Sequence, residues 1–398
     1  MKDNSTKEKL PDGWKLITLE SLSLKISDGI HATPKYSDAG DAYFINGNTL
    51  YNSKINISDD TKKVDYSEYL KHRRDLDQDN TILLSINGTI GSVAYYGNEQ
   101  VVLGKSCAYI KLNPTVNVDF IFFVLNSYDT QKYFISEVTG STIKNLSIRS
   151  IKSSLVKLPP LPEQNRIVAV LETWDMAIEK LTKKIEIKKE IKKWLMQELL
   201  TGKKRLQGFN SKWETVEIGE VFDYEQPTKY LVSSTEYADE HNVPVLTANK
   251  GFILGYTDET DGIYDTKSPV IIFDDFTTDN KFVDFKFKVK SSAIKILAAK
   301  NGKVNIKFLF EKMQLINFIV GQHKRHYLSE YQYIAIDIPE IDEQNQIENI
   351  LTTADKEIEV LRQKLSIIQD QKKHLLNNLI TGAIRTPETL TINNGENV

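Results

Sequence analysis

The sequence lacks the features that mark secreted and membrane-spanning proteins. Its one cysteine, Cys107, cannot form an intramolecular disulfide, and no run approaches the roughly 20 apolar residues that a membrane-spanning helix needs. The polar stretch from Met1 to Pro11 has no apolar segment of the kind found in signal peptides. We therefore expect a cytoplasmic protein that does not cross a membrane.

An excess of positive charge is also missing. The chain has 51 Lys and Arg residues against 54 Asp and Glu residues, which gives a net charge of −3. This balance excludes a protein that binds polyanions through its overall charge. Any nucleic acid must then be held by local basic patches.

What the chain does contain is an internal duplication. Residues 158–205 align without a gap to residues 338–385, and 20 of the 48 aligned positions are identical. The stretches in front of the two copies are less alike, but they share features in the same order, beginning with Trp14 and Trp213. The order of the chain is therefore arm, helix, arm, helix.

Each copy of the repeat predicts a long helix. With Ile167 or Ile347 as position a of a heptad, eight of ten a and d positions in the first copy and nine of ten in the second are apolar, which is typical of a coiled coil. A continuous helix from Glu163 to Thr201 would be about 58 Å long. We expect the two helices to pair in antiparallel orientation; the alternative is that each apolar stripe packs on its own arm.

The arms have mixed patterns. Short apolar runs bounded by Gly, Asn and Asp predict strands at 81–85, 101–103, 269–273 and 282–287, whereas 118–127 and 306–319 have helix-compatible patterns. The predicted fold class is α+β, with two globular α/β domains separated by two long antiparallel coiled-coil helices and related by a pseudo-two-fold duplication. The expected boundaries are 1–157 for the first arm, 158–207 for the first helix, 208–337 for the second arm, 338–386 for the second helix and 387–398 for a disordered tail.

Patterns that support catalysis or metal binding are incomplete. Gly104-Lys105-Ser106 ends like a phosphate-binding loop, but Glu99 stands where that motif requires its first glycine. His323-x-x-His326 has no second Cys or His pair nearby to complete a zinc site. We therefore predict a non-catalytic chain with no catalytic residues, no metal and no cofactor of its own.

The helices carry a resemblance to a known family. Each begins at a Glu-Gln pair, Glu163-Gln164 or Glu343-Gln344, and ends at a Thr-Gly pair. In this the chain resembles the specificity subunit of type I restriction-modification enzymes. Three segments of the first arm, 31–36 (HATPKY), 88–91 (GTIG) and 140–144 (GSTIK), resemble parts of that family's target recognition domains. The resemblance covers about residues 10–386.

The resemblance implies a function and a set of partners. Each arm is implied to be a target recognition domain that reads one half of a bipartite sequence in double-stranded DNA, and the helices are implied to set the spacer between the halves. Two modification subunits that use S-adenosylmethionine and two restriction subunits that use ATP and Mg²⁺ are implied partners. The resemblance further implies that the helix starts dock the modification subunits, through Glu163, Gln164, Glu343 and Gln344.

Loops that combine basic, hydroxyl, amide and aromatic side chains are the candidates for DNA contact, since such groups bond to phosphates and base edges. The alternative for each is a solvated turn that caps a strand. In the first arm the candidates are His31, Thr33, Lys35, Tyr36, Ser141, Thr142, Lys144 and Arg149. In the second arm they are Asn249, Lys250, Thr277, Thr278, Lys281, Gln322, His323, Lys324, Arg325, His326 and Tyr327.

The distribution of charge limits what the chain does alone. The first arm carries a net charge of +1, the first helix +4, and the second arm and the segment from 338 onward −4 each. Because neutralisation of phosphates supplies much of the affinity for DNA, we predict weak binding by the isolated chain and strong binding once basic partners are present.

The alternative to a DNA-reading function is a structural bridge, which tethers two protein partners through its coiled coil and does not read DNA.

Overall fold

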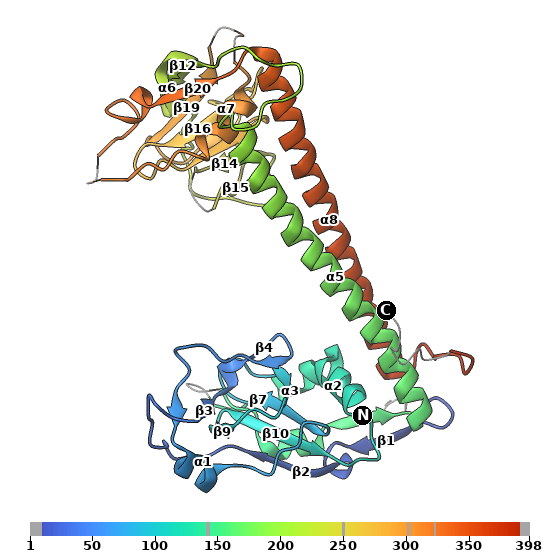
Figure 1. Ribbon diagram of the computed structural model, residues 1–398. Helices are drawn as coiled ribbons and strands as arrows, with labels where there is room; N and C mark the ends of the chain where they lie inside the picture. The colour runs from blue at the N-terminus through green and yellow to red at the C-terminus, as the bar shows by residue number, and fades with distance from the viewer. Residues whose placement is uncertain are drawn as a thin grey trace. The chain divides into compact units, whose positions relative to one another are not determined.

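The computed structural model describes residues 10–140, 144–248, 251–300, 302, 304–321 and 324–390. They form two compact units, one from the described residues up to Lys180 together with those from Leu365 onward, and one from Leu181–Lys364. Two long helices, α5 (Leu161–Leu199) and α8 (Ile341–Thr381), each contribute one part to the first unit and one part to the second (Figure 1). Each unit is thus one arm with a portion of both helices.

The first arm contains two main sheets. Its four-stranded antiparallel sheet has the order β2-β10-β7-β8, with strands Ser23–Asp28, Cys107–Leu112, Thr81–Ser85 and Val93–Tyr95. All of β7 is buried, as its apolar sequence predicts for an inner strand. A three-stranded sheet has the order β6-β3-β9, with strands Lys63–Val64, Ala42–Ile45 and Val101–Leu103, and β3 and β9 run parallel.

Shorter elements complete this arm. Strands β4 (Leu50–Tyr51) and β5 (Lys54–Ile55) pair with each other, and β1 (Lys15–Thr18) pairs with β11 (Leu155–Leu158), so the beginning and end of the arm meet just before α5. Its helices are α1 (Tyr66–His72), α2 (Val118–Asn126), α3 (Tyr128–Ser136) and α4 (Ile148–Ser153). Single 3-10 turns lie at η1 (Glu20–Leu22) and η2 (Gly47–Thr49).

The second arm repeats the topology of the first. Its four-stranded sheet has the order β13-β19-β16-β17, with strands Phe222–Glu225, Ile294–Ala299, Val270–Asp274 and Asn280–Val283. Its three-stranded sheet has the order β15-β14-β18, with strands Ile253–Thr257, Val243–Leu246 and Lys288–Val289, and again the last two run parallel. The duplication visible in the helices therefore extends to both arms.

The connections of the second arm are simpler. Strands β12 (Glu214–Glu217) and β20 (Ala335–Ile338) pair as β1 and β11 do, and α7 (Ile306–Met313) takes the place of α2. A short α6 (Ile218–Val221) and the 3-10 turns η3 (Pro227–Tyr230) and η4 (Tyr331–Tyr333) complete it. Among its described residues there is no counterpart of β4, β5, α1 or α3.

The two long helices pair within each unit. In the second unit Lys192 Nζ lies 2.7 Å from Asp355 Oδ1, and Lys188 Nζ lies 2.8 Å from Glu357 Oε1. Residue numbers rise along α8 where they fall along α5, so the two helices are antiparallel. In the first unit Lys372 pairs with Asp175. The duplication makes this ion pair equivalent to that of Lys192 with Asp355. The α+β fold with antiparallel helices is confirmed. These ion pairs also explain why lysines interrupt the apolar stripe, because their ammonium groups reach a carboxylate on the opposite helix.

The helix stripes and the arms share their cores. Ile167 and Leu171 of α5 belong to the same buried cluster as Phe120 of the first arm, and Ile347 of α8 belongs to the cluster that contains Phe308 of the second. Both packing modes considered for the stripe therefore occur, since the helices contact each other and an arm. Among the described residues, no helix is long and apolar enough to cross a membrane.

Two predicted elements have different bounds in the structure. Helix α7 ends at Met313, six residues before the pattern at 306–319 ends. The apolar residues that follow are needed elsewhere, since Phe318 packs edge-on against His326 with ring centroids 5.3 Å apart. The strand expected at 282–287 is β17, which begins at Asn280 and ends at Val283.

Candidate nucleic-acid interface

The joint between an arm and its long helix has the same hydrogen bonds in both units. In the first unit the side chain of Gln164 accepts from the backbone N–H of Asn117 (3.0 Å) and donates to Pro159 O (2.9 Å). In the second unit Gln344 makes the same two bonds, to Asn305 (2.9 Å) and Pro339 (2.8 Å). One glutamine therefore links the start of a long helix to the start of an arm helix, because Asn117 and Asn305 cap α2 and α7.

A buried glutamate completes each joint. Glu163 accepts from the indole N–H of Trp14 (3.1 Å) and pairs with the guanidinium of Arg385, which follows α8. Glu343 does the same with Trp213 (3.2 Å) and Arg205, which follows α5. The bond to the carboxylate raises the pKa of each arginine, since it favours the charged form.

These contacts give the four helix-start residues a role inside the chain. Glu163, Gln164, Glu343 and Gln344 are all buried, with at most 3% of each residue exposed. Side chains this buried offer almost no surface to a docking subunit, so the expectation that they bind a partner directly is corrected. These four residues would affect the binding of a modification subunit only indirectly, by holding the arm and the long helix together.

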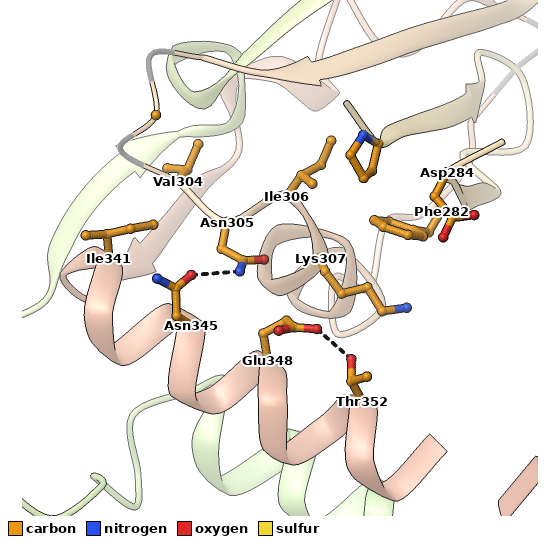
Figure 2. Close-up of a pocket in the computed structure, with 12 residues that line it drawn as sticks. Phe282, Asp284, Val304, Asn305, Ile306, Lys307, Ile341, Asn345, Glu348 and Thr352 are labelled. Carbon is orange, nitrogen blue, oxygen red and sulfur yellow. Dashed lines mark hydrogen bonds between the residues drawn. The ribbon is translucent and has the colours of Figure 1, made fainter. Parts of the chain in front are cut away.

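A cleft of about 780 Å³ lies beside the joint of the second unit. Figure 2 shows Asn305 and Asn345 side by side in its lining, joined by a hydrogen bond. The side-chain N–H of Asn305 donates to Asn345 Oδ1 at 2.8 Å. Lys307 lies over the ring of Phe282, 4.7 Å from the ring centroid. The polar groups here mostly bond to one another, and no group of three or more potential metal-ligating side chains was found among the described residues. The cleft adjoins the joint through Asn305 and Asn345.

The first candidate loop of arm one presents its polar groups outward. His31, Thr33, Lys35 and Tyr36 are all exposed. The ring nitrogen Nε2 of His31 lies 2.8 Å from a carboxylate oxygen of Asp28, at the end of β2. The backbone N–H of Lys35 donates to Glu68 of α1 (3.2 Å). The loop is thus anchored at both ends while its side chains remain accessible.

Sequence reasoning missed one basic residue at this loop. The ammonium group of Lys62 lies over the ring of Tyr36, 4.4 Å from the ring centroid, and Lys62 is itself exposed. The adjacent pair Lys62-Lys63 was the available signal, but nothing local places it against residue 36. The isolated bridge between Tyr36 and Val64 brings the two segments together.

The second candidate loop of arm one is only partly described. Lys144 and Arg149 are exposed, and Arg149 lies on α4. The backbone N–H of Leu146 donates to Ile86 O (2.9 Å), which holds this loop against the segment that follows β7. Ser141 and Thr142 lie outside the described residues.

In the second arm two candidate segments lie close together. Thr277 and Thr278 occupy the turn between β16 and β17, with Thr277 exposed and Thr278 at a φ of +61°. Lys281 is half-buried on β17, whereas Lys324 and Arg325 are exposed. The backbone N–H of His326 donates to Asp275 O (2.8 Å), so the two segments are joined. The candidates Asn249, Lys250, Gln322 and His323 lie outside the described residues.

Two of the predicted contacts in this arm point inward. His326 and Tyr327 are each 1% exposed. His326 packs against Phe318, and Tyr327 packs against Phe273 with ring centroids 5.4 Å apart. Burial raises the pKa of the Tyr327 hydroxyl. The expectation that these two side chains touch DNA is corrected, because both belong to the core beneath the loop.

Comparison with known proteins identifies relatives along most of the chain. The family model for the type I restriction modification DNA specificity domain matches residues 11–189 and 210–369. The EcoR124I/EcoR124II type I specificity subunit of Escherichia coli is 48% identical over 148 residues, which are 36% of this chain and 36% of that relative. The type I MjaVIII specificity subunit of Methanocaldococcus jannaschii is 22% identical over 342 residues, covering 77% and 80%.

A solved structure has a similar fold. The crystal structure of a type I restriction-modification S subunit from M. genitalium matches with a TM-score of 0.57 at 18% sequence identity. The match covers 94% of this chain and 98% of that one. The arrangement of two arms and two long helices is therefore shared at low sequence similarity.

Proposed function

The chain belongs to the type I restriction modification DNA specificity family, and we propose that it selects the DNA sequence on which a type I restriction-modification complex acts. Each arm reads one half of a bipartite target, and the paired helices set the spacer between the halves. The chain itself carries out no chemical step and holds no cofactor. We place this activity in the cytoplasm.

One observation supports this proposal best: the joints are the same in the two units while the loops differ. Gln164 and Gln344 make equivalent bonds, as do Glu163 and Glu343. By contrast, the anchor at the end of the equivalent strand is Asp28, paired with His31, in the first arm and Gln226, paired with Lys295, in the second. A duplicated frame with divergent loops suits a protein that meets two different half-sites.

The exposed surfaces of the two long helices support the proposal that the chain binds two modification subunits. Several residues are identical in the two copies and point to solvent, among them Ile187 (60% exposed) and Ile367 (56% exposed). Lys193 and Lys373 are a second exposed pair of this kind. Packing within the chain does not require these identities. They support two equivalent docking sites for two modification subunits, which use S-adenosylmethionine, with two restriction subunits that use ATP and Mg²⁺ in the full complex.

An exchange of the first arm tests the proposal. Residues 10–157 would be replaced by the equivalent arm of a relative, and modified adenines would be mapped in DNA from cells that express the chain with its modification subunits. We expect one half of the methylated sequence to change and the other to stay, because each arm reads its own half. Unchanged DNA specificity would favour the structural bridge instead.

A further inference from the structure

The two arms differ in chemistry at three equivalent buried positions. Strands β7 and β16 end at Ser85 and Asp274, and each of these residues pairs with the first residue of the neighbouring strand, β10 or β19. The next residue is Ile86 in the first arm and Asp275 in the second, and its N–H donates to Ser106 O or Ala293 O at 3.0 Å in both. The register of the two strand pairs therefore makes Ile86 equivalent to Asp275.

The strand pairing and the backbone hydrogen bonds also identify the other two equivalent positions. The second residues of β10 and β19 are Ala108 and Lys295, which pair with Leu84 and Phe273. The carbonyl of Ile86 accepts from Leu146 N–H (2.9 Å), as that of Asp275 accepts from His326 N–H (2.8 Å). All these side chains are buried. The apolar set Ile86, Ala108 and Leu146 thus corresponds to the polar set Asp275, Lys295 and His326.

The polar set connects three segments of the second arm. Lys295 Nζ lies 3.1 Å from Asp275 Oδ2 and donates to Gln226 Oε1 at 3.0 Å, and Lys295 and Asp275 are each 1% exposed. The other oxygen of Asp275 accepts from the backbone N–H of Tyr327 (2.8 Å). One ion pair therefore joins the end of β13, the turn after β16 and the segment that follows Arg325.

The segments joined by this pair carry candidate DNA contacts. Asp274 Oδ1 accepts from the N–H groups of Phe276 and Thr277, both at 2.9 Å, which fixes the turn that presents Thr277 and Thr278. Lys324 and Arg325 immediately precede the segment that Asp275 holds. The carboxylate of Asp275 thus connects the two candidate loops, beside the backbone bond from His326 N–H to Asp275 O.

A buried ion pair is weak evidence for a gain in stability. Removing two charges from water costs more than their attraction commonly returns, and well-packed apolar residues are often as stable or more stable. The first arm is an example within the same chain, since Ile86 and Ala108 fill the equivalent positions. The presence of the ion pair of Asp275 and Lys295 in the second arm therefore needs an explanation other than stability.

We propose that Asp275 and Lys295 are positioning residues that hold the two loops of the second arm in the geometry needed to read its half-site. This inference rests on the proposed function. The first arm, with apolar residues at these positions, positions its loops through other contacts, such as that of Asp28 with His31.

The test replaces the pair with the residues of the first arm, Asp275→Ile with Lys295→Ala, in the full chain assembled with its modification subunits. The complex methylates a library of randomised DNA, and the modified sites are sequenced. We expect first-half discrimination unchanged and discrimination at the second half lower by about tenfold, the size of one good base contact. Thermal stability should fall modestly, because the buried N–H of Tyr327 loses its acceptor. Ile272→Val on the same strand is the destabilising control, which should retain both halves.

Three results would overturn the inference. Full discrimination at both halves in the double variant would show that the pair does not position the loops. If the double variant fails to fold, the ion pair is needed for the fold of the second arm. The first arm folds with Ile and Ala at the equivalent positions, so the inference predicts a folded variant. A wild-type complex that specifies no second half-site would overturn the proposed function, and this inference with it.

Discussion

The guanidinium of Arg385 binds both carboxylate oxygens of Glu163, at 2.5 and 2.7 Å. Glu163 lies in the first turn of α5 and Arg385 follows the end of α8, so the end of one long helix fixes the start of the other. Arg205 and Glu343 repeat the arrangement in the second unit with the helices exchanged. Each unit therefore has a closed joint of arm, helix start and helix end.

Removal of the glutamate should destabilise its joint. Glu343→Ala leaves the indole N–H of Trp213 and the guanidinium of Arg205 without their acceptor. We expect the free energy of unfolding of the second unit to fall by about 2 kcal/mol, below the usual cost of breaking a fully buried pair because Arg205 is partly exposed to water. Urea denaturation followed by tryptophan fluorescence measures the change.

Glu359→Ala, at an exposed position of α8, is the matched control and should change stability by less than about 0.5 kcal/mol. Equal effects of the two substitutions would show that the buried joint contributes no more than the helix surface does.

The first unit should gain stability when one carboxylate is removed. Burial, with the nearby carboxylates Asp119 and Asp175, raises the pKa of Glu172. A carboxyl group whose pKa is raised on folding favours the folded state below its unfolded pKa, and this contribution is lost as pH rises through the folded pKa. At pH 7 the charged Glu172 is therefore unfavourable, although Lys372, which pairs with Asp175, reduces the local charge.

We expect Glu172→Gln to stabilise the chain by about 0.5 kcal/mol at pH 7, a modest value because solvent screens the group. The gain should shrink as the pH falls below the normal range for glutamate. Thermal unfolding across pH measures it, with Glu190→Gln at an exposed site of α5 as control. A gain that persists in acid would contradict the electrostatic cause.

The exposed cations of the second arm should contribute to DNA affinity without specifying sequence by themselves. Removing Lys324 and Arg325 together should reduce the slope of log affinity against log salt by about 1 to 2, since each phosphate contact releases counterions. Fluorescence anisotropy of the assembled complex at several salt concentrations measures the slope. Lys15→Ala on β1 is the control, and an unchanged slope in the double variant would exclude phosphate contacts by these two residues.

Local pattern predicted the frame of the molecule better than it predicted the site. The heptads gave α5 and α8, and the apolar runs at 81–85 and 101–103 are β7 and β9. These elements depend on neighbours a few residues away. The antiparallel pairing was predicted from the duplication, and the ion pair of Lys192 with Asp355 now explains a lysine on the apolar stripe.

The errors concern side chains whose partners are distant in sequence. The family resemblance implies that Glu163 contacts a partner subunit, but the structure pairs it with Arg385, which no local pattern connects to it. His326 and Tyr327 lie in a run of polar donors that is typical of an exposed loop, but their backbone groups bond to Asp275 and turn both rings inward. Exposure along such a run is decided by the tertiary fold.

The most direct test of the account lengthens both helices together. Seven residues would be inserted between Lys180 and Leu181 and seven between Lys364 and Leu365, where the two compact units divide each helix. Two added helical turns are about 10.5 Å, or about three base pairs of DNA. Modified adenines mapped in cells that express the variant with its modification subunits should show both half-sites unchanged and a gap longer by about three base pairs. Methylation at the original spacing would contradict the claim that the helices set the distance between two reading arms.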